Sequence, residues 1–200
     1  KSGFAGSNIY DADSNRESNL EFNLDSGVTV EFWLKRGELE TSMTEKQVIF
    51  DLWNGQNSSS VDYGRLRIEI TGASSGSPFL ITAMSGTSGF QTSSIGTNLT
   101  ITSLDSWGHY AFSFLSGASD ISASLYVNGE LNQLSQLGDT SINEVTGALN
   151  AYIGALKTAP SGSEGEFHDI ASGAGKLSAS LDEFRYWKAK RTSEDIGRYW

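Results

Sequence analysis

The sequence predicts an all-β fold in which two antiparallel sheets pack as a sandwich, with one short helix near the C-terminus. Three observations support this prediction. Helical periodicity is nearly absent, short runs of alternating apolar and polar residues recur along the chain, and loops rich in Ser, Gly, Thr and Asn separate them. The 200 residues fit one sandwich with a large core. We therefore expect residues 1–200 to form a single domain, excised from a larger protein.

Side chains alternate between the two faces of a strand, so an apolar residue at every second position marks a buried face. Six runs show this pattern: residues 20–24, 28–35, 47–54, 65–71, 110–114 and 123–127. Residues 151–153 give one more strand, and residues 79–84 and 99–101 are weaker candidates. Asn128-Gly129 supplies the two-residue turn of a hairpin that continues at residue 130.

The same alternation predicts which side chains meet between the sheets. The predicted core members are Phe32, Phe50, Leu66, Ile68, Phe112, Leu125 and Phe184. His109 falls on the opposite face of its strand, where we expect it to face solvent. Neither His109 nor His168 follows the nucleophile-elbow pattern, so the sequence gives no support to a Ser-His-Asp site.

The last predicted strand changes the parity of its apolar face. Apolar residues occupy the odd positions of 177–181, whereas Phe184 and Tyr186 continue the face at even positions. A period of two cannot change parity without an extra residue, so we predict a bulge near Asp182-Glu183.

The polar run after this strand combines a helix signal with a cluster of cations. Thr192 and Asp195 have the spacing of a capping box, which predicts a helix of one or two turns. The cations of this region are Arg185, Lys188, Lys190, Arg191 and Arg198. They allow two interpretations, a solvated rim around the helix or a contact with an acidic neighbouring domain.

The overall composition excludes several classes of protein. The chain has no cysteine, which excludes disulfides, thiolate metal sites and cysteine catalysis, and favours a microbial or viral source. The net charge of −10 argues against nucleic acid as a partner. No apolar run is long enough to span a bilayer, so we expect no membrane insertion.

Five segments resemble, in the same order, strands of laminin-G-like and pentraxin-like domains. They are residues 28–35, 107–114, 124–130, 150–154 and 181–187, the last reading Leu-Asp-Glu-Phe-Arg-Tyr-Trp. One departure is Gly108, which separates the Trp from the His in the second segment. These domains belong to the concanavalin A-like lectin and glucanase superfamily. The resemblance implies an antiparallel jelly-roll sandwich.

The resemblance also implies a role in recognition rather than catalysis. Glucanases of the superfamily carry a Glu-x-Asp-x-(x)-Glu motif, which this chain lacks, and the neighbours Asp182 and Glu183 would normally point to opposite faces of their strand. We therefore expect a non-enzymatic, glycan-binding or adhesion module of a larger protein. Its partner would be a glycan or a neighbouring protein domain.

The expected location is extracellular or on a virion surface, and the composition suits virion proteins of marine bacteriophages. The alternative is a purely structural domain of a virion or multidomain protein, with no small ligand.

Aromatic residues on a non-core face are the best candidates for sugar binding, because sugars stack on aromatic rings while amides and carboxylates meet their hydroxyls. Trp33 and Trp53 lie opposite the apolar parity of their strands, and we predict that they share the outer face of one sheet. The alternative to sugar binding is that loops or a neighbouring domain cover these two tryptophans. The predicted glycan-binding residues are Trp33, Trp53, Asp62, Tyr63 and Arg65. The other tryptophans are assigned to the core or to a domain junction: Trp107, Trp187 and Trp200.

A calcium site is a further expectation, because laminin-G-like and pentraxin-like domains often hold Ca²⁺ in edge loops. Hard cations need several oxygen ligands, which Asp51, Asn57 and Asp62, with Asn54 nearby, could supply. Residues 11–15 form a second oxygen-rich loop, although Arg16 stands where an EF-hand needs Gly. The alternative for the first group is an ordinary hairpin loop whose Asn and Asp side chains hold turns.

Overall fold

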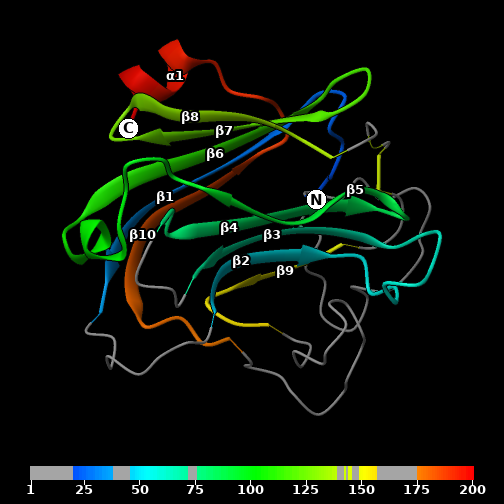
Figure 1. Cartoon of the computed structure of the whole chain (residues 1–200), viewed down its shortest axis with the longest axis horizontal. Helices are drawn as coiled ribbons and strands as arrows, with labels where there is room; N and C mark the ends of the chain where they lie inside the picture. Colours follow the sequence, from blue (N-terminus) through cyan, green and yellow to red (C-terminus); the bar gives the residue numbers. More distant parts are fainter. Residues whose placement is uncertain are drawn as a thin grey trace.

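The computed structural model describes residues 20–37, 46–71, 76–138, 142, 144, 145, 149–156 and 175–200. They form a sandwich of two antiparallel five-stranded sheets (Figure 1), which confirms the predicted fold class. In spatial order, the first sheet contains β10 (Ala179–Trp187), β1 (Val28–Arg36), β6 (Gly108–Ser116), β7 (Ile121–Val127) and β8 (Glu130–Leu137). The second contains β5 (Ser88–Ile95), β4 (Phe79–Ser85), β3 (Gly64–Ile70), β2 (Gln47–Trp53) and β9 (Asn150–Ile153).

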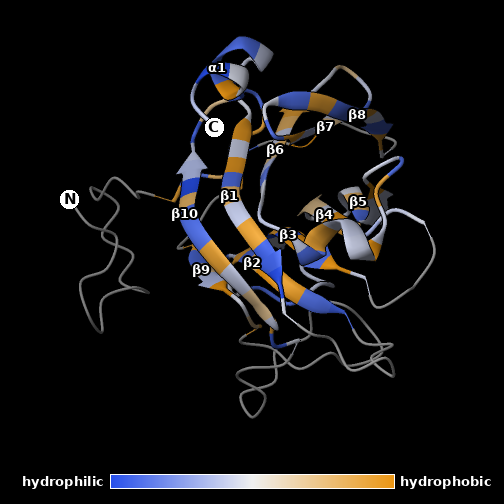
Figure 2. Cartoon of the chain, turned by 90° about the vertical axis from the view of Figure 1, so that its left-hand side faces the viewer, coloured by the Kyte–Doolittle hydropathy of each residue, from blue (hydrophilic) through white to orange (hydrophobic). Residues whose placement is uncertain are grey.

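The hydrophobic core lies between the two sheets. Six of the seven predicted core residues are at most 1% exposed: Phe32, Phe50, Leu66, Ile68, Phe112 and Leu125. Phe184 is only partly buried, with its ring centre 6.1 Å from that of Phe32 and 5.2 Å from that of Phe50. Because those two rings belong to opposite sheets, Phe184 closes the core beneath β10. Figure 2 shows the alternation of hydrophobic and hydrophilic residues along β1 and β10.

The strand β10 contains the predicted bulge. Glu31 of β1 pairs with Arg185, and Trp33 pairs with Asp182, so three steps along β10 match two along β1. Glu183, within the extra step, has a φ of 46°, in the left-handed region that a bulge can impose. The change of parity in the sequence therefore has the expected physical cause.

The hairpin turn is confirmed, and three local predictions are wrong. Asn128 and Gly129 join β7 to β8 with φ angles of 49° and 79°, as a type I′ turn requires. Residues 99–101 do not form a strand, and a 3₁₀ helix, η2 (Ile101–Asp105), begins there instead. Residues 20–24 contain only one isolated bridge, from Phe22 to Val145. Strand β5 lies where the sequence predicts no strand, and it was missed because only two of its eight residues are buried and its alternation is weak.

The C-terminal helix α1 (Ser193–Arg198) packs on the outer face of the first sheet. The predicted capping box is present, since Thr192 accepts a hydrogen bond from the backbone of Asp195 and the Asp195 side chain reaches back to Thr192. Ile196 is fully buried against Ala111 and Tyr126, whose side chains point away from the core. Among the residues placed by the structure, no helix is long and apolar enough to cross a membrane.

Candidate functional site

The two tryptophans expected to share a face lie on different sheets. Trp33 belongs to β1 in the first sheet, and Trp53 belongs to β2 in the second. Each points away from the core, since its neighbours Phe32 and Leu52 are core residues. The outer faces of a sandwich lie on opposite sides, so the predicted shared face is wrong. The alternation of apolar and polar residues predicts to which face of a strand a side chain points. It does not predict which of the two sheets that strand joins, because this depends on the connections between strands.

Trp53 and three other predicted glycan-binding residues lie together, but Trp53, Tyr63 and Arg65 form a closed cluster. Trp53, Tyr63 and Arg65 are 1%, 4% and 1% exposed. The Arg65 guanidinium lies 5.7 Å from the centre of a Trp53 ring, and the indole N–H donates to the carbonyl of Gln56 at 2.8 Å. Asp62 is exposed beside them. The structure thus uses Trp53 for packing and leaves no open indole face for a sugar.

The predicted calcium ligands include one carboxylate that already has a cation. Both oxygens of Asp51 accept hydrogen bonds from Arg65, at 2.6 and 3.0 Å, and both side chains are buried. Burial opposes the charge of Arg65, but Asp51 outweighs it and raises the pKa of the guanidinium. Asn57 accepts a backbone hydrogen bond within its own loop, and Asp62 is exposed. Calcium binding there would require Asp51 to exchange Arg65 for the ion.

The described part of the chain contains no group of three His, Cys, Asp or Glu residues suited to a metal. Residues 11–15 lie outside that part. Calcium binding therefore stays a prediction.

Two adjoining hollows on the outer face of the first sheet form what we call the C-terminal groove. The larger, of about 950 Å³, is lined by the end of β10 and by residues of the segment 189–200. The smaller, of about 410 Å³, is lined by Trp33 and Trp107 together with the bulge of β10. Arg185, Tyr199 and Trp200 line both hollows, so the two lie side by side and share these three residues.

Exposed aromatic surface is concentrated in this groove. Every aromatic side chain that is exposed in the described residues lines one or both hollows: Trp107 (48%), Trp187 (41%), Tyr199 (59%) and Trp200 (47%). Trp33 lies at the base of the smaller hollow, half-buried, with its ring centre 5.8 Å from that of Trp200. Of the five predicted glycan-binding residues, Trp33 is the one that this groove contains.

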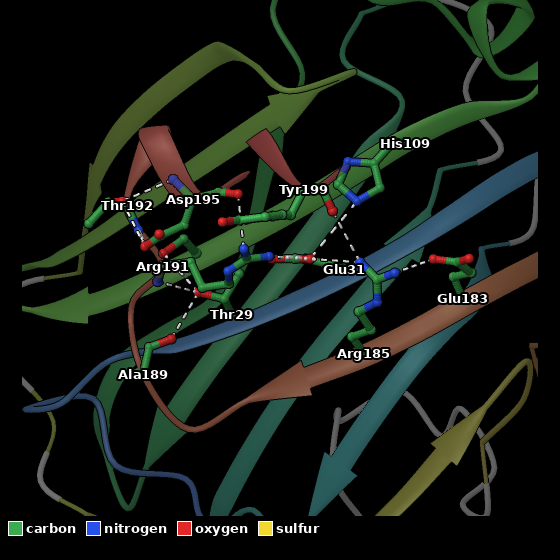
Figure 3. A network of polar contacts seen from close by, with 11 residues as sticks. Thr29, Glu31, His109, Glu183, Arg185, Ala189, Arg191, Thr192, Asp195 and Tyr199 are labelled. Carbon is green, nitrogen blue, oxygen red and sulfur yellow. Dashed lines mark hydrogen bonds and ion pairs between the residues drawn. The ribbon is translucent and has the colours of Figure 1, made fainter. Parts of the chain in front are cut away.

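A buried carboxylate anchors the segment that forms the groove (Figure 3). Glu31 of β1 is fully buried, and Arg191 donates to its two oxygens at 2.6 and 2.8 Å. A second guanidinium, that of Arg185, lies 3.9 Å from Glu31. A buried carboxylate without a partner is strongly unfavourable. Glu31 therefore holds Arg191, and with it the segment that follows β10, against the first sheet.

Further hydrogen bonds secure the same segment. The Thr29 hydroxyl donates to the carbonyl of Ala189 at 3.0 Å and accepts from the backbone N–H of Arg191 at 2.9 Å. Arg191 also donates to the carbonyl of Asp195 at 2.9 Å and lies over the ring of Trp187 at 4.7 Å. These contacts hold the aromatic walls of the larger hollow in place without a ligand.

His109 lies beneath the groove rather than in solvent. It is 1% exposed, because Trp33 and Trp200 cover it with ring centres 5.7 and 6.2 Å away. Neither ring nitrogen has a hydrogen-bond partner among the residues that the structure describes. Burial, with the positive charges of Arg185 and Arg191, lowers the pKa of His109 to about 4. The expected face was right, but the expectation of solvent exposure was wrong, because a segment 91 residues away covers the ring.

The bulge brings two carboxylates to the same hollow. Asp182 and Glu183 both line the smaller hollow, although sequence neighbours on a regular strand would point to opposite faces. Glu183 forms an ion pair with Arg185, which also donates to the carbonyl of Tyr199 at 3.3 Å. The groove thus offers hydrogen-bond acceptors and a guanidinium donor beside its aromatic rings.

The sequence singles out the residues of this groove but predicts other roles for them. It assigns Trp107, Trp187 and Trp200 to the core or to a domain junction, yet all three are exposed groove residues. The cation cluster within residues 185–198 indicates a solvated rim or a neighbouring domain rather than a ligand site. The available signal was the combination of basic residues with Trp187, Tyr199 and Trp200 in the last fourteen residues.

Comparison with known proteins places this fold among carbohydrate-related folds. A protein family described as the concanavalin A-like lectin/glucanases superfamily matches residues 11–197. A search of the curated proteins finds no match.

Solved structures provide more distant similarities. The chain is similar to a putative carbohydrate-binding protein from Bacteroides ovatus, with 16% identity and a TM-score of 0.53 over 90% of this chain and 41% of that one. It is similar to the CBM40 module of the Ruminococcus gnavus IT-sialidase, solved with α2,3-sialyllactose, with 12% identity and a TM-score of 0.52 over 89% and 90%. A heptameric SAP-like pentraxin from Limulus polyphemus gives 13% identity and a TM-score of 0.53 over 90% and 71%.

Proposed function

Since this chain belongs to the concanavalin A-like lectin/glucanases superfamily, we propose that it is a non-catalytic recognition module that binds glycan in the C-terminal groove. The observation that carries the proposal is that all exposed aromatic side chains of the described residues converge on that groove. Large apolar rings are unfavourable on a surface unless something covers them, so their concentration marks a binding surface.

The groove has the ingredients that sugar binding requires. Trp33, Trp107 and Trp200 offer flat faces for the apolar side of a pyranose ring, and Asp182 and Glu183 can accept hydrogen bonds from hydroxyl groups. The hollows, of about 410 and 950 Å³, have the volume of ordinary ligand sites, and a few polar groups among apolar walls are typical of such sites. Because the contacts of Glu31 already hold the groove segment in place, less conformational entropy is lost when a ligand binds.

Two of the similar structures support this assignment, since both are carbohydrate-binding proteins by description. The non-catalytic part of the proposal rests on the absence of the glucanase carboxylate motif from the sequence. We further propose adhesion as the biological role, at an extracellular or virion surface, within a larger protein.

A glycan array followed by calorimetry on the best saccharide tests the proposal. Trp200→Ala and Trp107→Ala should each weaken binding by about tenfold or more, because each removes a stacking face. Leu134→Ala is the matched control: Leu134 is 55% exposed on β8 and lines neither hollow, so this variant should bind as the wild type does. The bound saccharide should be recovered uncleaved.

The alternative, a purely structural domain, makes the opposite prediction. If no saccharide binds, and the groove tryptophans become shielded from solvent only when the domain is joined to its neighbouring domains, the groove is a contact surface between protein domains. Hydrolysis of the saccharide would instead overturn the non-catalytic assignment.

A further inference from the structure

The cations near the C-terminus are not one uniform solvated rim. Four of the five form ion pairs with carboxylates: Arg185, Lys188, Arg191 and Arg198. The ammonium of Lys190 makes no ion pair with any residue that the structure describes, although the side chain lines the larger hollow. Within the described residues, one free cation therefore faces the groove.

The larger hollow is the basic end of the groove. It is lined by Arg185, Lys190 and Arg191, and Asp195 is the single acidic residue among the described residues of its lining. Arg191 is committed to Glu31 by two short hydrogen bonds. Arg185 has five N–H donors and makes two hydrogen bonds, to Glu183 and to the carbonyl of Tyr199. Lys190 and Arg185 thus have capacity left for a ligand.

The other end of the groove has the opposite character. The smaller hollow is lined by Asp182 and Glu183, and Arg185 is the only cation among the described residues that line it. The whole chain carries a net charge of −10, so its overall field repels an anion, and local cations are needed to hold one. The charge along the groove therefore changes sign, and aromatic side chains line both ends.

From this arrangement we propose that the groove selects an anionic glycan, whose carboxylate or sulfate is held by Lys190 and Arg185 in the larger hollow. Neutral sugar rings of the same chain then occupy the smaller hollow, against Trp33 and Trp107. The proposal rests on glycan binding and adds the ligand class. A saccharide fits better than an acidic peptide because Trp187, held under Arg191, and Trp200 present fixed flat surfaces in the walls beside Lys190.

The test compares charged and neutral forms of the same saccharide by calorimetry. One pair is a galacturonic acid oligosaccharide and its methyl ester; the other is a sulfated galactan oligosaccharide and its desulfated form. The charged form should bind about tenfold more tightly, and added salt should reduce that advantage. The two pairs show whether the groove prefers carboxylate or sulfate.

Lys190→Gln should weaken binding of the charged form by roughly five- to tenfold and leave the neutral form unchanged. Lys188→Gln removes the same charge two residues away, at a side chain that pairs with Glu21 and lines neither hollow, so it is the matched control. Retained melting temperatures should confirm that both variants are folded.

The outcomes are distinguishable. Equal binding of charged and neutral forms, or equal effects of Lys188→Gln and Lys190→Gln, overturns the anionic selectivity while glycan binding stands. If neither form of any saccharide binds, the proposed function fails, and this inference fails with it. Polyglutamate binding that depends on Lys190 but not on Trp200 would assign the basic end to a protein and would also overturn it.

Discussion

At the scale of single residues, the tryptophans differ in how much of the side chain is exposed, and this decides the role of each. Trp53 is 1% exposed beneath its own loop, whereas Trp107 is 48% exposed in the groove. The same residue type thus stabilises packing at one position and offers a binding face at the other. A mutation at each position should therefore affect different properties.

Trp53→Ala should destabilise the protein by about 3–5 kcal/mol, because it leaves a cavity where the indole packs on Arg65 and Tyr63. Trp107→Ala should change the free energy of unfolding by less than about 0.5 kcal/mol, as substitutions of exposed side chains usually do. Urea unfolding of both variants measures the difference. If Trp53→Ala instead keeps the melting temperature and abolishes glycan binding, Trp53 is a binding residue after all.

His109 predicts a defined dependence of stability on pH. Its pKa is about 4 in the folded protein and 6.5 for an unperturbed histidine, so between these values the unfolded chain takes up a proton that the folded chain does not. Stability should therefore fall as the pH decreases from 6.5 to about 4, by at most about 1.4 kcal/mol per pH unit from this group. Below pH 4 its contribution levels off.

Denaturant unfolding over this range, compared with His109→Gln, isolates the contribution, because the carboxylates titrate alike in both proteins. Identical slopes in the two proteins would mean that the buried imidazole is protonated in the fold. Charged groups facing it are Glu31, Arg185 and Arg191.

At the scale of elements, the segment from β10 through α1 depends on one carboxylate. Glu31→Gln should leave Arg191 and Arg185 without a buried counter-charge, and breaking such a pair costs about 3–5 kcal/mol. The local result should be release of residues 188–200, faster tryptic cleavage after Lys188 and Lys190, which both variants retain, and weaker glycan binding. Glu31→Gln combined with Arg191→Met should restore part of the protection. Unchanged cleavage would show that Thr29 and Ile196 suffice to hold the segment.

The loop between β2 and β3 carries the calcium prediction. Saturating Ca²⁺, added to protein stripped with a chelator, should raise the melting temperature if Asp51, Asn57 and Asp62 bind the ion in the native state only. Asp62→Ala should abolish the rise. If the melting temperature does not change with Ca²⁺, this segment is an ordinary hairpin loop whose side chains hold turns, consistent with the hydrogen bonds from Arg65 to Asp51.

At the scale of the whole molecule, one core joins the two sheets. The ring of Phe112 contacts Phe32 of its own sheet at 5.8 Å and Phe79 of the opposite sheet at 5.1 Å. Phe112→Ala should therefore cost about 3–5 kcal/mol and lower the melting temperature of the entire domain. Calorimetry should still show one cooperative transition. Two separate transitions would mean that the sheets unfold independently.

The sequence by itself determined most of the strands, their buried faces, one β-bulge and one helix cap. Alternation identified six fully buried core residues because a period of two is a property of the strand alone. The change of parity located the bulge at Glu183, and the spacing of Thr192 and Asp195 located the helix cap. The weakly patterned β5 was missed because its residues are mostly polar.

Only the tertiary structure decided which sheet each strand joined and what covered its outer face. Trp33, His109 and Trp200 meet across 76 and 91 residues of sequence, and no local pattern encodes such a contact. The same limit explains why the sequence did not decide between a sugar and a loop as the cover of Trp53, and why the groove was not foreseen. Local periodicity fixes the direction of a side chain, whereas its exposure depends on distant segments that fold over it.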